Sequence, residues 1–112
     1  IRAQDVEELA EQQPEIRARE ASAFSITDGN DITSIVLVIE CRLTSTEERQ
    51  SLINRLQRLV YMAFGVKSMV ELVSPHTLPR TSSGKLSRYA ARKGFIQRAD
   101  FADPMSVESR DR

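Results

Sequence analysis

The chain has 112 residues, of which 40% are hydrophobic and 29% charged, a balance typical of one globular domain rather than of a disordered or membrane-embedded segment. Sixteen basic residues offset sixteen acidic ones, and the longest apolar run, residues 35–39, is too short to span a bilayer. With one cysteine, Cys41, and one histidine, His76, the sequence excludes a disulfide framework and a multi-cysteine zinc site. We therefore expect a cytoplasmic protein without a bound metal, in which Cys41 is inert and His76 has a structural or solvent-facing role.

The charges are unevenly distributed. Residues 1–20 hold six acids against three arginines, whereas residues 79–98 hold six bases and no acid. The net charge of zero therefore conceals an acidic beginning and a basic end.

The first elements expected are a helix and a hairpin. Asp5 can cap a short helix that ends before Pro14, with Glu8 completing a box-like pattern. Two strands, over 21–26 and 32–39, flank an Asp-Gly-Asn turn that tolerates positive φ and so predicts antiparallel pairing. The second strand is an aliphatic run that suits a central position covered on both faces.

A longer helix follows over residues 46–64, between a Ser45 capping-box pattern and Gly65. We then expect a third strand over 69–73, a loop over 74–84, and a short closing helix that ends before Gly94. Residues 99–112 are predicted to form a flexible tail. This order predicts an α+β fold: a small three-stranded sheet, antiparallel or mixed, with helices packed on it.

The segment that carries chemistry is Leu-Pro-Arg-Thr-Ser-Ser-Gly-Lys-Leu-Ser-Arg, residues 78–88. It is not a Walker A loop, because Pro79 stands where that loop needs its first glycine and Leu86 stands where a serine or threonine should follow the lysine.

The spacing Pro79-x-x-x-x-Gly84-Lys85, with Arg88 three residues on, resembles the C-terminal signature of the adenylate-forming enzymes. That superfamily includes acyl-CoA synthetases, fatty acyl-AMP ligases, nonribosomal peptide adenylation domains and luciferases. The start of the chain, Ile-Arg-Ala-Gln-Asp-Val-Glu, resembles the hinge-proximal segment N-I-x-P-Q-D-I-E of the same enzymes, with Ala3 where many relatives have proline. The resemblance identifies residues 1–98 as the small C-terminal lid domain, and it implies a hinge and a large ATP-binding domain upstream of Ile1.

The resemblance implies a role for each matching residue. Lys85 would be the catalytic lysine of adenylation, since its ammonium can attract the carboxylate and phosphate oxygens on which negative charge develops. Gly84 would let the backbone approach the nucleotide closely, with polar groups from Thr81, Ser82 and Ser83 beside it. Support or docking roles would fall to Arg80 and Arg88, and hinge-proximal roles to Gln4 and Asp5.

The implied reaction joins a fatty or other carboxylic acid to ATP, supplied with Mg²⁺, to give acyl-AMP, and then transfers the acyl group to CoA or to a phosphopantetheinyl carrier protein. The segment over residues 8–14 and the hydroxyl run resemble fatty acyl-AMP ligases, which use a carrier protein, slightly more than CoA ligases. We expect the lid to rotate against its N-terminal domain between the two steps, and the isolated chain to be inactive.

Two other hypotheses remain open. Bases and aromatic residues alternate toward the C-terminus, which could suit a nucleic-acid-binding module: Arg80, Lys85, Arg88, Tyr89, Arg92, Lys93, Phe95 and Arg98. Acetylation of Lys85, which would remove its positive charge, could regulate an adenylating enzyme.

Overall fold

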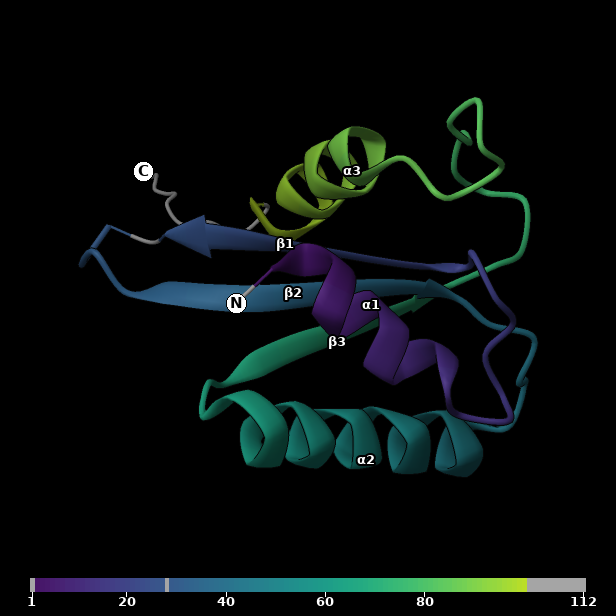
Figure 1. The fold of residues 1–112 in the computed structure, drawn as a ribbon, viewed down its shortest axis with the longest axis horizontal. Helices are drawn as coiled ribbons and strands as arrows, with labels where there is room; N and C mark the ends of the chain where they lie inside the picture. Colours follow the sequence, from purple (N-terminus) through teal and green to yellow (C-terminus); the bar gives the residue numbers. More distant parts are fainter. Residues whose placement is uncertain (1, 28, 101–112) are drawn as a thin grey trace.

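The computed structural model describes residues 2–27 and 29–100, and the side chains of this part as far as residue 98. Six elements follow in chain order (Figure 1): α1 (Ala3–Glu11), β1 (Ala21–Thr27), β2 (Thr33–Glu40), α2 (Thr46–Phe64), β3 (Ser68–Val73) and α3 (Arg88–Asp100). The predicted tail begins within the last turn of α3, and its residues 101–112 lie outside the described residues.

The strands form one mixed sheet in the order β1-β2-β3. β1 and β2 pair antiparallel, as the turn chemistry predicted, with Ala23 opposite Leu37. β3 pairs parallel to β2, because the crossover through α2 returns the chain to the end of the sheet at which β2 begins. The predicted α+β fold is confirmed, and of the two sheet types left open the mixed one is correct.

The central strand β2 separates two layers of apolar packing. Leu37 and Ile39 face a core formed with residues of α1 and α2, whereas Val36 and Val38 face a second core under α3. All four side chains have no exposed surface, so coverage of both faces is confirmed. Figure 1 shows α2 running along β3 while α3 lies beside β1.

The boundaries of α2 agree with the sequence. The Ser45 hydroxyl accepts a hydrogen bond from the Glu48 backbone N–H, which caps the first turn. Gly65 ends the helix in the left-handed conformation with φ of 72°, and its N–H donates to the Tyr61 carbonyl.

The predicted cap of α1 and the predicted end of α3 are wrong. Asp5 lies inside the first turn of α1, where it pairs with Arg2, the residue at the N-cap position. The closing helix does not end before Gly94 but continues to Asp100. Phe95 packs edge-on against Phe24 at 5.9 Å between ring centroids, and this contact outweighs the cost of about 1 kcal/mol for glycine inside a helix.

Candidate functional site

The segment singled out by the sequence forms a tight turn that is closed by its own backbone. The Thr81 N–H donates to the Lys85 carbonyl at 2.8 Å, and the Gly84 N–H donates back to the Thr81 carbonyl at 2.9 Å. A third bond joins the Ser87 N–H to the Pro79 carbonyl at 3.1 Å. Gly84 adopts a φ of 84°, so the turn requires a conformation that residues with a side chain rarely adopt.

The hydroxyl side chains of this turn face solvent. Thr81, Ser82 and Ser83 are all exposed, and the hydroxyl groups of Thr81 and Ser83 lie 3.0 Å apart in a hydrogen bond. The turn therefore presents a polar surface to solvent.

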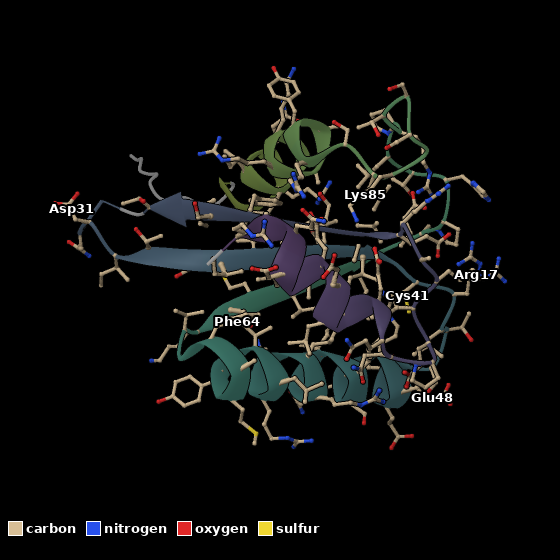
Figure 2. The ribbon with its side chains drawn as sticks, viewed as in Figure 1. Arg17, Asp31, Cys41, Glu48, Phe64 and Lys85 are labelled. Atoms are coloured by element: carbon tan, nitrogen blue, oxygen red, sulfur yellow. The ribbon has the colours of Figure 1, made fainter. Side chains whose placement is uncertain are left out.

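Lys85 is only partly exposed and points at acidic residues of α1. Its Nζ lies 3.2 Å from Oε1 of Glu7 and 3.3 Å from Oε2 of Glu11. Figure 2 shows Lys85 at the same end of the sheet as Arg17 and Cys41, far from Asp31 in the β1–β2 turn. The basic loop has no acid near it in the sequence, and its lysine instead forms ion pairs with acidic residues of the first helix.

Glu7 is the centre of this cluster. It is fully buried and accepts hydrogen bonds from Arg88 Nε at 2.6 Å, from Arg88 Nη2 at 2.9 Å and from the Ala23 N–H at 2.8 Å. Burial alone would raise the pKa of Glu7, but the hydrogen bonds from Arg88 and Ala23 and the charge of Lys85 lower its pKa below the ordinary value. The Ala23 bond also occupies a backbone donor on the edge strand β1.

A second buried carboxylate, Glu40 at the end of β2, holds the beginning of the loop. It accepts hydrogen bonds from the Thr77 and Leu78 N–H groups at 3.1 and 3.3 Å. It also forms an ion pair of 2.6 Å with Nη2 of Arg80. The two arginines to which the sequence analysis gave support or docking roles thus form ion pairs within the domain: Arg80 binds Glu40 and Arg88 binds Glu7.

The two hinge-proximal residues are not brought to Lys85. The Gln4 amide donates to Glu8 at 3.3 Å, and Asp5 pairs with Arg2 at 3.1 Å. Both contacts lie within four residues along α1. The helix therefore turns Glu7 and Glu11 toward the loop and leaves Gln4 and Asp5 in local contacts.

Three glutamates of the site were missed by the sequence analysis as partners of the loop: Glu7, Glu11 and Glu40. Two signals could have found the buried ones. Glu7 follows the buried Val6 and lies one turn before the buried Ala10, and Glu40 ends an unbroken apolar strand. A carboxylate in such a position needs a cationic or N–H partner, and the basic end of the chain offers several.

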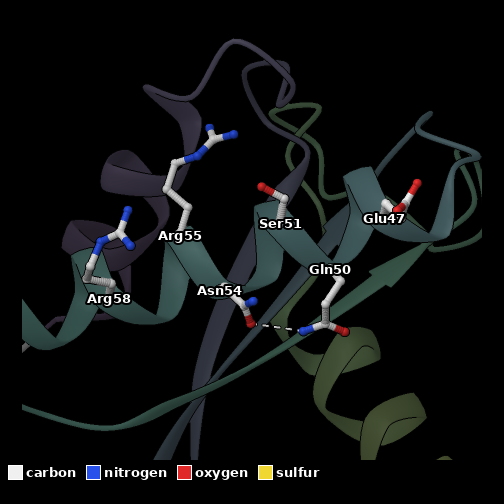
Figure 3. Close-up of a pocket in the computed structure, with 6 residues that line it drawn as sticks. All are labelled: Glu47, Gln50, Ser51, Asn54, Arg55 and Arg58. Atoms are coloured by element: carbon white, nitrogen blue, oxygen red, sulfur yellow. Dashed lines mark hydrogen bonds between the residues drawn. The ribbon is translucent and has the colours of Figure 1, made fainter.

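Within residues 2–27 and 29–100, no group of three or more His, Cys, Asp or Glu side chains is placed to hold a metal ion, and no helix there is long and apolar enough to cross a membrane. A hollow on α2 is lined by Glu47, Gln50, Ser51, Asn54, Arg55 and Arg58 (Figure 3). None of these residues belongs to the loop, and Lys85 pairs with Glu7 and Glu11 instead, so we assign the hollow no part in the site.

Comparison with known proteins gives this geometry a context. No family model matches the chain. A putative acyl-CoA synthetase of Caulobacter vibrioides is 32% identical over 94 residues, which cover 83% of this chain and 16% of that protein. A chain from structural studies of fatty acyl-adenylate ligases of E. coli and L. pneumophila is 40% identical with a TM-score of 0.74, and the match covers 88% of this chain and 17% of that one. The chain matches a C-terminal domain of the adenylate-forming superfamily.

A more distant structure shares the fold of this C-terminal domain. The adenylation and carrier unit McyG A-PCP, complexed with phenylalanyl-adenylate, is 17% identical with a TM-score of 0.74 over 91% of this chain and 19% of that one. The domain thus spans between 16% and 19% of the length of these three relatives.

The nucleic-acid-binding alternative finds no support. The relatives at 32% and 40% identity are named as an acyl-CoA synthetase and a fatty acyl-adenylate ligase, and neither name refers to nucleic acid. Of the interleaved residues on which that hypothesis depended, Lys85, Arg88 and Arg98 form ion pairs with carboxylates of the same domain, and Phe95 packs against Phe24.

Proposed function

We propose that this domain is the lid of a ligase that activates a fatty or other carboxylic acid with ATP as acyl-AMP and then transfers the acyl group to a thiol. The observation that carries the proposal is Lys85 on a tight turn that depends on Gly84, in a domain 40% identical to part of a fatty acyl-adenylate ligase chain. ATP would enter as its Mg²⁺ complex, bound mainly by an N-terminal domain.

Lys85 would act by electrostatic stabilisation. Its ammonium would exchange the carboxylates of Glu7 and Glu11 for the substrate carboxylate and phosphate oxygens as negative charge develops on them. Because Lys85 is already partly desolvated, the exchange replaces one set of oxygen partners by another and requires little loss of hydration. The exposed hydroxyls of Thr81 and Ser83 and the backbone at Gly84 would supply polar contacts beside it.

The lid would then rotate and withdraw Lys85, so that the segment around Gln4 and Asp5 faces the thiol tunnel. In this second position the ammonium returns to Glu7 and Glu11, which is the arrangement that the domain adopts here. The same domain would thereby serve adenylation and thiol transfer in turn.

The decisive experiment separates the two half-reactions in the full-length ligase that carries this domain. Lys85→Ala should slow acyl-AMP formation by about a hundred- to a thousandfold, the loss typical of one oxyanion-stabilising donor, and leave transfer from supplied acyl-AMP nearly unchanged. Lys93→Ala, which removes an exposed lysine on α3, is the matched control and should leave both rates unchanged. Equal losses in both half-reactions for Lys85→Ala would contradict the proposal.

For the acceptor, we propose the phosphopantetheine thiol of a carrier protein in preference to CoA. The 40% identity to a fatty acyl-adenylate ligase chain supports this choice, whereas the relative from Caulobacter vibrioides favours CoA. Incubation of the full-length ligase with a fatty acid, ATP and either CoA or holo-carrier protein tests it, since acyl-CoA as the main product would overturn the preference.

The 112-residue chain alone should catalyse no ATP–pyrophosphate exchange with any carboxylic acid. The reason is that the lysine and the hydroxyls of the described part lie on an exposed turn, whereas ATP would be bound mainly by the N-terminal domain. Exchange by the purified chain would contradict the division of labour between two domains.

A further inference from the structure

The loop that carries Lys85 is held at both ends by buried carboxylates, Glu7 at its end and Glu40 at its beginning. We propose that Glu40 is a positioning residue for adenylation, which acts on Lys85 through Arg80. This inference rests on the proposed function and deepens it, because it adds a residue of a different element to the machinery of the same site.

Glu40 fixes the chain where it leaves the sheet. Its Oε2 accepts the Thr77 and Leu78 N–H groups at 3.1 and 3.3 Å, two consecutive backbone donors just before Pro79. The Glu40 side chain has no exposed surface, so the carboxylate end of these bonds is shielded from water although Thr77 and Arg80 are exposed. The first residues of the loop are thereby tied to the rigid central strand β2.

Arg80 links Glu40 to the turn that holds Lys85. Its Nη2 binds Oε1 of Glu40 at 2.6 Å, while its Nη1 donates to the Gly84 carbonyl at 3.3 Å and to the Arg19 carbonyl at 2.7 Å. The planar guanidinium thus spans from the strand to the peptide bond that precedes Lys85. Without Glu40 the guanidinium loses its 2.6 Å ion pair and keeps the longer one of 3.8 Å with Glu20, so the turn loses its direct bond to β2.

A role in core packing does not explain this glutamate. A fully buried carboxylate stabilises a fold no better than a well-packed apolar side chain, because its desolvation offsets its attraction to an arginine. The neighbouring apolar residues Val38 and Ile39 complete the packing of β2 on its two faces. What Glu40 adds is a set of directed bonds, and all of those found in the structure go to residues 77–80 of this loop.

The test compares four variants of the full-length ligase. Glu40→Gln keeps an oxygen for the two backbone donors but presents an uncharged amide to Arg80, and Arg80→Gln removes the same ion pair from the partly exposed side. Glu15→Gln is the matched control, because Glu15 also pairs with an arginine, Arg55, but lies away from the loop. Lys85→Ala gives the full loss expected from the site.

Glu40→Gln and Arg80→Gln should each lower kcat for acyl-AMP formation by about ten- to a hundredfold, the effect typical of a catalytic group displaced by about 1 Å. The KM for ATP and the transfer of acyl groups from supplied acyl-AMP should change less than about twofold, and Glu15→Gln should change nothing. Equal losses in both half-reactions would show a merely structural role and overturn the inference, as would normal adenylation in a folded Arg80→Gln enzyme.

A second readout uses the 112-residue chain and does not depend on catalysis. In Glu40→Gln and Arg80→Gln, hydrogen exchange at the Thr81 and Gly84 N–H groups should be about tenfold faster than in the wild type and in Glu15→Gln. Unchanged exchange at these two groups would overturn the inference. Normal adenylation by Lys85→Ala would instead overturn the proposed function itself, so the two failures are distinguishable.

Discussion

The ammonium of Lys85 lies 3.3 Å from the carboxylate of Glu11, although 74 residues separate them in the chain. This contact joins the acidic beginning of the domain to its basic end, so the polarised charge pattern of the sequence is neutralised locally in the folded structure. The lysine proposed to meet a nucleotide therefore has carboxylate partners within its own domain.

The first prediction concerns the release of this lysine. In the 112-residue chain, Glu11→Gln should make Lys85 react about two- to fivefold faster with an amine reagent, because it removes a partly buried carboxylate whose attraction is worth about 1 kcal/mol or less. Brief labelling with deuterated acetic anhydride and quantification of the Lys85 peptide by mass spectrometry would measure the rate. Glu15→Gln is the control, and an equal rate in both variants would contradict a role for Glu11 in holding the lysine.

The second prediction tests the buried pair of Glu7 and Arg88. Arg88→Met should lower the free energy of unfolding by about 1–3 kcal/mol, because Glu7 stays buried and loses two hydrogen bonds while it keeps Lys85 and the Ala23 N–H. Urea unfolding followed by circular dichroism would measure the change.

Arg98→Met is the matched control for that experiment. Arg98 forms a similar two-pronged pair with Glu71, but the Glu71 side chain is 24% exposed whereas that of Glu7 is fully buried, so the loss should stay below about 1 kcal/mol. A loss at Arg88 no larger than that at Arg98 would contradict the importance of burial for the Glu7 pair.

Much of the fold could be predicted from the sequence because local signals agreed with tertiary packing. The boundaries of α2 depend on Ser45 and Gly65, whose capping geometry is set within one turn. The end of α3 could not be predicted in this way. Gly94 is a local signal that a helix ends, but Phe95 packs against Phe24 on β1. The two residues of this contact lie far apart in the sequence, so local patterns do not reveal it.

The site was predictable only in part for the same reason. Lys85, Gly84 and Arg88 are recognisable from their spacing, because the turn that joins them is local. Their carboxylate partners come from α1 and β2, and neither the pairing of Glu7 with Arg88 nor that of Glu40 with Arg80 leaves a pattern in a single sequence. Burial of a charged residue in an apolar context signals that a partner exists but does not say which one.

The third prediction concerns pH. The pKa values of Glu7, Glu15 and Glu20 are lowered below the ordinary 4.5, although burial of each carboxyl acts to raise its pKa. At Glu7 burial is the largest single influence, but the hydrogen bonds from Arg88 and Ala23 together outweigh it. At Glu15 and Glu20 the largest cause is the hydrogen bond from Arg55 and Arg42, respectively. Below about pH 4.5 the unfolded chain therefore binds more protons than the folded chain, so acid favours unfolding.

The stability from these groups should be complete above about pH 4.5 and be lost as the pH falls through their lowered pKa values. Urea midpoints measured between about pH 7 and pH 3 should follow this course. The double variant Glu15→Gln, Glu20→Gln should show a shallower dependence, since two of the carboxyl groups with lowered pKa values are absent. An identical dependence in the variant and the wild type would show that these ion pairs do not control acid unfolding.

The last prediction concerns the backbone of the turn itself. Gly84→Ala should lower the free energy of unfolding by about 1–2 kcal/mol, because a φ of 84° is unfavourable for alanine. Crowding is not the cause, since the added Cβ would meet its nearest atom, Nη1 of Arg19, at an ordinary 3.5 Å. Gly29→Ala is the control: no atom lies within 4 Å of that Cβ position and its φ is not in the left-handed range, so the change should stay within about 0.5 kcal/mol. Equal effects at the two glycines in urea unfolding would mean that the left-handed residue before Lys85 is not what shapes the turn.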